Sequence, residues 1–248
     1  MKKDKVSVII PAYHCAGTIR KAIDSALMQE VPLEVLVIDD CGGEDIEGIV
    51  KEYGAEPRLF YVKNEKNLGA AATRNKAARL ATGNYLAYLD ADDWWEKGKL
   101  QKQLLKLQET GDVLCCTARE LATPEGNLTG KVIPVHERLT YRELLKHNQI
   151  NCSSVLIRRE AALKFPMEHE DSHEDYITWL RVLKEYGTAS GINEPLLKYR
   201  LSSQGKSGSK LHSAAMTFKV YRYMGFGMGR SVLCFLSYAA HGIWKYLA

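Results

Sequence analysis

The sequence predicts an α/β protein with a mostly parallel sheet flanked by helices, and two patterns carry this prediction. Short apolar runs alternate with helical segments through the first half of the 248-residue chain, which is typical of βαβ units. Two of these runs end in acids, because residues 35–38 lead into Asp39 and residues 85–89 lead into Asp90. Carboxylates at the carboxyl ends of parallel strands lie where open α/β sheets bind their ligands.

The elements expected in the first half follow from apolar spacing and from helix start and stop signals. Strands are predicted at 6–10, 35–38, 59–62 and 85–89, and helices at 18–29, 45–53 and 69–81. Thr18 is a suitable N-cap for the first helix, and Gly83 follows the end of the third.

The second half is less regular. A helix is predicted at 97–108, strands at 113–117, 155–158 and 196–199, and a further helix at 172–186. Asp171 or Ser172 can cap that last helix. Adjacent Cys115 and Cys116 should point to opposite faces of their strand, and the six cysteines show no metal or disulfide spacing, so reduced thiols are expected.

The charge of the chain is unevenly distributed. From residue 195 onward there are eight Lys or Arg and no acid, whereas the first 194 residues carry a net charge of −4. At helical spacing, one face of the tail carries Arg230, Ser237, His241 and Lys245, and the rest is apolar and aromatic. We expect a first domain at 1–209 (halves 1–95 and 96–209), a hinge at 225–229 and a basic amphipathic helical tail at 210–248. The tail is predicted to lie on an anionic membrane surface, with packing on the body or in a homodimer as the alternatives.

Three carboxylates fall within residues 90–93, directly after an apolar run. Their repulsion is costly unless a cation joins them, and carboxylate oxygens and water are the ligands that Mg²⁺ and Mn²⁺ prefer. Asp90 and Asp92 would lie on the same side if the strand persists. These residues predict a divalent-cation site for a metal–diphosphate substrate, with a solvated acidic turn as the alternative.

Two more groups are expected at the same sheet edge. At Asp39 and Asp40, one carboxylate could accept the N–H of a pyrimidine base, or the pair could only form a turn. Gly69 allows close backbone approach at a helix start, and Arg74 one turn later could bind a diphosphate. An ordinary surface arginine is the alternative for Arg74.

His173, Glu174 and Asp175 open an amphipathic helix. The helix dipole favours an ionised carboxylate at this end, so it could act as a base. Plain N-terminal helix acids are the alternative.

In their order and spacing, these motifs resemble the family 2 glycosyltransferases over roughly residues 5–205. The similar stretches are residues 7–13, 37–40, 67–69, 78–80 with Gly83, 89–93 and 173–175. The resemblance implies a GT-A fold with a Rossmann-like sheet, and inverting transfer from a nucleotide-diphosphate sugar, most often a UDP-sugar. Cys41-Gly42-Gly43 stands where the family more often has Gly-Ser-Thr.

The resemblance also implies site residues. Asp175 would be the catalytic base, oriented by Glu174, and Asp92 would hold Mn²⁺ or Mg²⁺. Asp40 would contact uracil with support from Asp39, and Asp90 would lie near the ribose. The full nucleotide-sugar-binding set expected is Pro11, Ala12, Tyr13, Asp39, Asp40, Asn67, Gly69, Arg74, Asp90, Ala91, Arg200, Lys206 and Ser207.

The function expected is therefore sugar transfer to a glycan or lipid-linked acceptor in bacterial cell-surface polysaccharide synthesis. The first five residues contain no apolar signal segment, so we expect a cytoplasmic protein at the inner face of the plasma membrane, without a nucleic-acid partner. Two alternatives stay open. A sugar nucleotidyltransferase would show a Gly-rich basic loop after the first strand, unlike residues 14–17, and a catalytically silent nucleotide-sugar-binding scaffold would not need Asp92 and Asp175.

Overall fold

The computed structural model describes residues 4–201 and 210–247. Its strands are β1 (Val6–Ala12), β2 (Leu33–Asp39), β3 (Leu59–Lys63), β4 (Tyr85–Tyr88), β5 (Trp94–Trp95), β6 (Leu114–Ala122), β7 (Leu128–Ile133), β8 (Arg138–Thr140), β9 (Leu156–Arg158) and β10 (Thr188–Arg200). The helices are α1 (Ile19–Leu27), α2 (Ile46–Lys51), α3 (Ala70–Leu80), α4 (Lys99–Thr110), α5 (Tyr141–Lys146), α6 (Arg159–Lys164), α7 (Glu174–Tyr186), α8 (Lys210–Tyr223) and α9 (Met228–Leu247), with a 3₁₀ turn at Cys152–Ser154.

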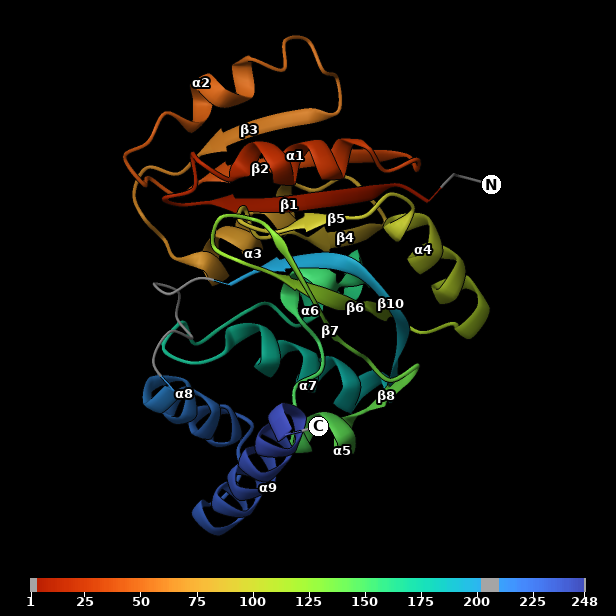
Figure 1. The fold of residues 1–248 in the computed structure, drawn as a ribbon, viewed down its shortest axis with the longest axis vertical. Coiled ribbons are helices and arrows are strands. Elements are labelled where there is room, and N and C mark those ends of the chain that lie inside the picture. The colour runs from red at the N-terminus through yellow and green to blue at the C-terminus, as the bar shows by residue number, and fades with distance from the viewer. Residues whose placement is uncertain (1–3, 202–209, 248) are drawn as a thin grey trace.

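The strands form one ten-stranded sheet with the order β3-β2-β1-β4-β9-β6-β10-β5, while β7 and β8 pair with β6 and β10 (Figure 1). Strands β1 to β4 are mutually parallel where they pair, as are β6 and β10. The short β9 is antiparallel to both of its neighbours, β4 and β6. The predicted α/β class with a mostly parallel sheet is confirmed.

Two apolar layers cover the two faces of the sheet, because successive strand residues point to opposite sides. Helices α1, α2 and α4 pack on one face, and α3, α5, α6, α7 and α8 pack on the other (Figure 1). Cys115 lies in the first layer and Cys116 in the second, which confirms the opposite directions predicted for this pair. All six cysteines are free thiols.

Of the two predicted helix caps, the position of the first is confirmed and the second is wrong. Thr18 occupies the N-cap position of α1, but its hydroxyl donates to a preceding carbonyl (3.2 Å) and makes no cap hydrogen bond. Before α7, His173 holds the cap position without a side-chain bond, instead of Asp171 or Ser172. The Asp171 carboxylate and the Ser172 hydroxyl instead bind α8, at 2.8 Å from Lys219 Nζ and 3.0 Å from a backbone carbonyl. Their side chains therefore serve tertiary packing.

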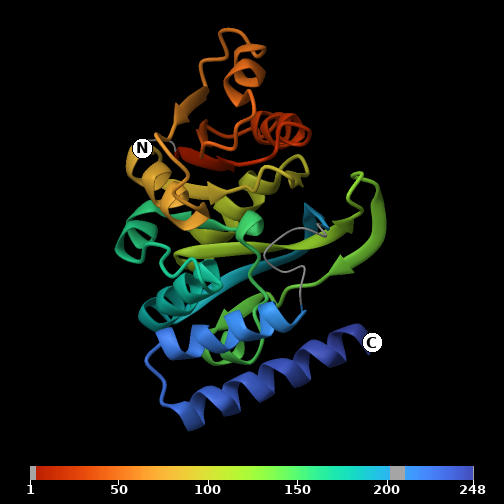
Figure 2. The ribbon, with the colours of Figure 1, turned by 90° about the vertical axis from the view of Figure 1, so that its left-hand side faces the viewer.

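The tail consists of two helices, and Figure 2 shows α8 and α9 as an antiparallel pair beneath α7. The chain turns between Tyr223 and Met228, where a hinge was predicted. On α8, Tyr221 is fully buried and donates to Leu145 O of α5 (2.9 Å). Among the described helices, none is both long enough and apolar enough to cross a bilayer.

Helix α9 has one packed face and one exposed face. Phe235 and Tyr238 pack against the core, so the alternative of a tail folded onto the body holds for this face. Leu233 and Leu236, by contrast, are 69% and 58% exposed. Of the predicted polar face, the side chains of His241 and Lys245 lie outside the described residues.

A buried carboxylate, Glu34, joins β1, β2 and the turn before β4. It accepts hydrogen bonds from Lys5 Nζ (2.8 Å), Ser7 Oγ (2.6 Å) and Thr82 N (2.6 Å). Burial alone would raise the pKa of Glu34, but these hydrogen bonds lower it to about 2.

We expect Glu34→Gln to lower the free energy of unfolding by about 2 kcal/mol at pH 7. Because the unfolded carboxyl has a pKa of about 4.3, this contribution is complete above that value and is lost as the pH falls toward 2. Urea unfolding of native protein and variant from pH 7 to pH 3 should show the difference shrinking. Equal stability at pH 7 would contradict the assignment.

Candidate active site at the carboxyl ends of the strands

The carboxyl ends of β1, β2 and β4 border a cavity of about 710 Å³. Its walls contain most of the predicted binding residues: Pro11, Tyr13, Asp40, Asn67, Gly69, Arg74, Asp90, Ala91 and Arg200, together with the predicted metal ligand Asp92. Ala12 and Asp39 lie buried behind this wall. Lys206 and Ser207 fall outside the described residues.

Residues 90–93 form a turn. Strand β4 ends at Tyr88, and Asp93 N donates to Asp90 O (3.0 Å), so the strand does not persist and the period-two argument for Asp90 and Asp92 is wrong. Both carboxylates nevertheless line the cavity. Asp93 is buried, and its Oδ1 accepts from Arg200 N (2.9 Å). The alternative of a solvated acidic turn is therefore excluded.

The surroundings of Asp92 compensate its negative charge only in part, because burial and Asp90 outweigh the effect of Arg200 and Arg74. Burial raises the pKa of Asp92 to about 6, and the neighbouring Asp90 carboxylate acts in the same direction. Within the described chain, Asp92 forms no ion pair, and no group of three or more His, Cys, Asp or Glu side chains could hold a metal. The donor set fits a divalent cation that takes one carboxylate from the protein and its other ligands from substrate oxygens and water.

Asp40 fixes the loop that leads into α3. Its carboxylate accepts hydrogen bonds from Asn64 Nδ2 (2.7 Å), Leu68 N (2.8 Å) and Gly69 N (2.9 Å). Gly69 precedes α3 with φ +84°, a backbone conformation that favours glycine. Asp40 thus positions the first turn of α3 against the cavity.

Asp39 binds on the other side of the same strand end. Its carboxylate accepts from Tyr61 OH (2.7 Å) and from Cys41 N (2.9 Å). Cys41 has φ +58°, and its thiol donates to Asn64 O (2.8 Å). The Cys41-Gly42-Gly43 sequence therefore forms a tight turn beside Asp40.

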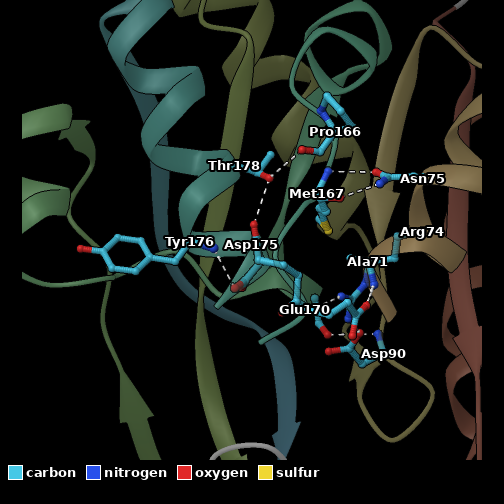
Figure 3. Close-up of polar contacts among 12 residues, drawn as sticks. Ala71, Arg74, Asn75, Asp90, Pro166, Met167, Glu170, Asp175, Tyr176 and Thr178 are labelled. Carbon is cyan, nitrogen blue, oxygen red and sulfur yellow. Dashed lines mark hydrogen bonds and ion pairs between the residues drawn. The ribbon is translucent and has the colours of Figure 1, made fainter. Parts of the chain in front are cut away.

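Arg74 joins two parts of the site. Its side chain is only 7% exposed, so the surface-arginine alternative is wrong. One terminal nitrogen donates to Asp90 Oδ1 (2.5 Å) (Figure 3). The other donates to Glu174 Oε1 (3.1 Å). The guanidinium thereby links the end of β4 to the start of α7.

Asp175 follows Glu174 in the first turn of α7. Burial raises the pKa of Asp175 to about 7, the Glu174 carboxylate acts in the same direction, and Arg74 opposes it. Its Oδ1 accepts from the backbone N of Tyr176 (2.7 Å). Figure 3 shows the Asp175 carboxylate at this Tyr176 nitrogen, apart from the Arg74–Asp90 contact. Neither Asp175 nor Glu174 lines the cavity, whose wall nearest to them is formed by Arg74 and Asp90. A carboxyl with a pKa near neutral pH can act as a general base.

Comparison with known proteins identifies the family. Residues 7–165 match the family described as glycosyl transferase family 2. The chain belongs to this family.

Two relatives align over nearly the whole chain of this family 2 glycosyltransferase. TuaG of Bacillus subtilis, named for teichuronic acid biosynthesis, is 37% identical over 99% of this chain and 98% of its own. WfaP of Escherichia coli, a UDP-Glc:α-D-GlcNAc-diphosphoundecaprenol β-1,3-glucosyltransferase, is 30% identical over 97% of this chain and 95% of its own.

Among solved structures, the S. aureus TarS fragment 1–349 in complex with UDP-GlcNAc superposes with a TM-score of 0.73. It is 18% identical, and the match covers 93% of this chain and 70% of that one. The shared architecture confirms the predicted GT-A fold.

The β6–β7 hairpin contacts the predicted site residue Arg200, and no role in the site was predicted for the hairpin itself. Arg200 Nε donates to Asp92 O (2.9 Å), and its NH1 donates to Pro124 O (2.7 Å) at the hairpin tip. Gly126, with φ +91°, packs so closely that a Cβ there would lie 2.9 Å from Arg200 NH1. Figure 2 shows the hairpin curving out from the body, with its tip returning toward the sheet.

Other cavity residues were also missed by the sequence analysis. These are His14, Cys15, Thr18, Ala70, Pro124, Glu170 and Leu201. Only the turn-rich composition around Pro124 gave a local signal, since such loops often carry binding residues.

We expect Gly126→Ala to reduce sugar transfer about tenfold, because the new methyl group displaces the guanidinium that holds the Asp92 loop. Gly130→Ala is the matched control: it has φ +74° in the same hairpin, with no atom within 4 Å of the added Cβ. Urea unfolding and transfer assays should show a similar small loss of stability, about 1 kcal/mol, in both variants. Equal activity in the two variants would contradict this role for the hairpin tip.

Proposed function

We propose that this glycosyltransferase is an inverting enzyme that moves a sugar from a UDP-sugar to a hydroxyl of a glycan or lipid-linked acceptor in bacterial cell-surface polysaccharide synthesis. The observation that carries the proposal is the chain of contacts from Asp90 through Arg74 to Glu174, the residue that precedes Asp175. It joins the donor cavity to the candidate base. The substrates printed in the names of WfaP and of the TarS complex support a UDP-sugar donor and a lipid-diphosphate acceptor.

The cavity has the size and lining that a nucleotide-sugar needs. Its volume of about 710 Å³ lies within the range of small-molecule sites. In the proposal, Pro11, Ala12 and Tyr13 border the base, Asp40 lies beside uracil with Asp39 behind it, and Asp90 lies near the ribose. Arg74 and Arg200 are proposed to bind the diphosphate, as are Lys206 and Ser207, which lie outside the described residues. Asn67, Gly69 and Ala91 complete the proposed nucleotide-sugar-binding set.

Asp92 is proposed to hold the divalent cation, Mn²⁺ or Mg²⁺. When bound, such an ion neutralises the charge that develops on the departing diphosphate, an effect worth several kcal/mol. The raised pKa of Asp92 supports this placement, because a cation would favour the ionised carboxylate.

Asp175 is proposed to take the proton of the acceptor hydroxyl while that oxygen attacks the anomeric carbon on the face opposite the diphosphate. The bond from this carbon to the diphosphate oxygen breaks in the same step, so the configuration inverts. Glu174 and Arg74 keep the start of α7 in place during the transfer. A single displacement needs no covalent intermediate on the protein.

The exposed face of α9 is proposed to contact an anionic membrane at the cytoplasmic side. Met228, Val232, Leu233 and Leu236 are exposed at a spacing that places them on one side of the helix. The chain beyond residue 194 carries basic residues and no acids, which favours anionic headgroups. A lipid-linked acceptor would be presented at such a surface.

We expect Asp175→Asn to reduce transfer by roughly 10²–10⁴-fold, because the amide cannot accept the hydroxyl proton. In the native enzyme, kcat/KM should rise as the pH increases toward about 7 and then level off, since the base works only when it is deprotonated. Release of UDP from a panel of UDP-sugars with Mn²⁺ and a lipid-diphosphate acceptor measures both effects.

Glu185→Gln on the exposed side of α7 is the matched control and should keep native activity. If UDP-sugars bind but neither native enzyme nor control turns any of them over, a silent binding protein is the better description. Native turnover by Asp175→Asn would instead overturn the role of this residue.

For the tail, we expect the double change Leu233→Gln and Leu236→Gln to weaken binding to phosphatidylglycerol vesicles by about 100-fold, because two buried leucines contribute roughly 3 kcal/mol. Deleting α9 would be a poorer test, since its other face covers the core. Leu80→Gln with Leu105→Gln is the control, because both leucines are exposed elsewhere. Equal co-sedimentation of the two double variants would refute the contact.

A further inference from the structure

Residues 165–173 lead into the candidate base, Asp175. This segment is attached to α3 by Asn75, which has no part in the proposed reaction. Asn75 Nδ2 donates to Met167 O (2.7 Å), and Met167 N donates back to Asn75 Oδ1 (2.9 Å). Both polar atoms of one amide thus pair with one backbone residue, as a neighbouring strand would. Figure 3 shows Asn75 reaching from α3 to Met167.

The same face of α3 makes two more contacts with this region. Ala71 N donates to the Glu170 carboxylate, and Arg74 donates to Glu174. Positions 71, 74 and 75 are neighbours on one side of a helix, because residues three and four apart lie above one another. One face of α3 therefore holds three residues before and at the start of α7, namely Met167, Glu170 and Glu174.

Helix α3 is in turn fixed to the donor cavity. Asp40 accepts from Gly69 N at the helix start, and Arg74 holds Asp90 at the end of β4. Asn75 does not line the cavity and is 92 positions from Met167 in the sequence. Its contact with Met167 therefore fixes the position of α7 relative to the cavity, and does not bind a substrate.

We propose that Asn75 is a positioning residue for Asp175: its paired hydrogen bonds to Met167 set where α7 begins relative to the donor cavity. This inference rests on the proposed function, in which Asp175 is the base. A displacement of about 1 Å between a base and its substrate can reduce a rate about 100-fold without changing substrate affinity.

The test compares Asn75→Ala with Arg79→Ala, an exposed control on the same helix. We expect kcat of Asn75→Ala to fall 10- to 100-fold, with KM for the UDP-sugar and the affinity for UDP, measured by calorimetry with Mn²⁺, unchanged within twofold. Asn75→Gln keeps both polar groups on a longer side chain and should recover part of the lost kcat. Arg79→Ala should match the native enzyme.

A pH profile separates positioning from a loss of fold. The titratable and charged groups that face Asp175 in the described chain are Glu174, Arg74, Asp90 and the Cys152 thiol, and Asn75→Ala changes none of their charges. A looser segment admits water to the Asp175 carboxylate, so the acidic limb of kcat/KM should move to lower pH. An unmoved limb would overturn the inference.

Other outcomes are also decisive. A native kcat in Asn75→Ala, or a loss of UDP affinity in parallel with kcat, would overturn the positioning role while Asp175→Asn stays inactive. Full activity of Asp175→Asn would instead show that the proposed base is wrong, whatever the Asn75 variants do. The two failures are thereby distinguished.

Discussion

The buried guanidinium of Arg74 lies between the carboxylates of Asp90 and Glu174, and the geometry of the site depends on this three-residue contact. An isolated charge at such depth costs several kcal/mol, so each partner is needed to offset the desolvation of the others. Glu174 is 100 positions from Arg74 in the chain. This contact therefore prevents independent movement of the end of β4, the first turns of α3 and the start of α7. It fixes the cavity wall relative to the candidate base.

The single positive charge of Arg74 does not balance the carboxylates around it. It faces Asp90 and Glu174, while Asp92 and Asp175 add two more carboxyls whose pKa values burial raises to about 6 and about 7. Added positive charge would relieve this repulsion, which is the reason for proposing a cation at Asp92. It also makes Asp175 a stronger base than an exposed aspartate, since proton transfer is most effective when the pKa lies near the working pH. Burial and crowding of acids thus serve both halves of the proposed reaction.

The parts of the site that the sequence predicted are those encoded within a few residues. Asp39 and Asp90 follow apolar strands, and Gly69 precedes an Ala-rich helix, so their positions at one sheet edge follow from the general geometry of βα units. The burial of Arg74 was not predictable, because it arises from contacts 16 and 100 positions away. The Asn75–Met167 pair left no local pattern for the same reason.

Short elements were missed for a different reason. Strand β5 has two residues, β8 has three, and α5 and α6 have six each, which is too few for an apolar period to appear. The predicted caps of α7 were wrong because Asp171 and Ser172 bind α8, a partner that only the folded chain brings near. Strand interiors and long helices are thus readable from local sequence, whereas short edges and helix ends depend on tertiary neighbours.

The contacts of Asp171 and Ser172 with α8 also attach the tail to the segment that precedes the candidate base. Asp171 accepts from Lys219 Nζ (2.8 Å) and Tyr223 OH (2.9 Å) on α8, while Glu170, one residue earlier, accepts from Ala71 N on α3. The segment before the candidate base therefore lies between the donor wall on one side and the tail on the other. Because α9 packs on α8 and α5, a membrane contact at its exposed face would be transmitted to α7 through two helix contacts. If the proposed membrane contact and the proposed base both hold, an acceptor at the bilayer would meet a base whose position depends on contacts with α3 and with the tail helices.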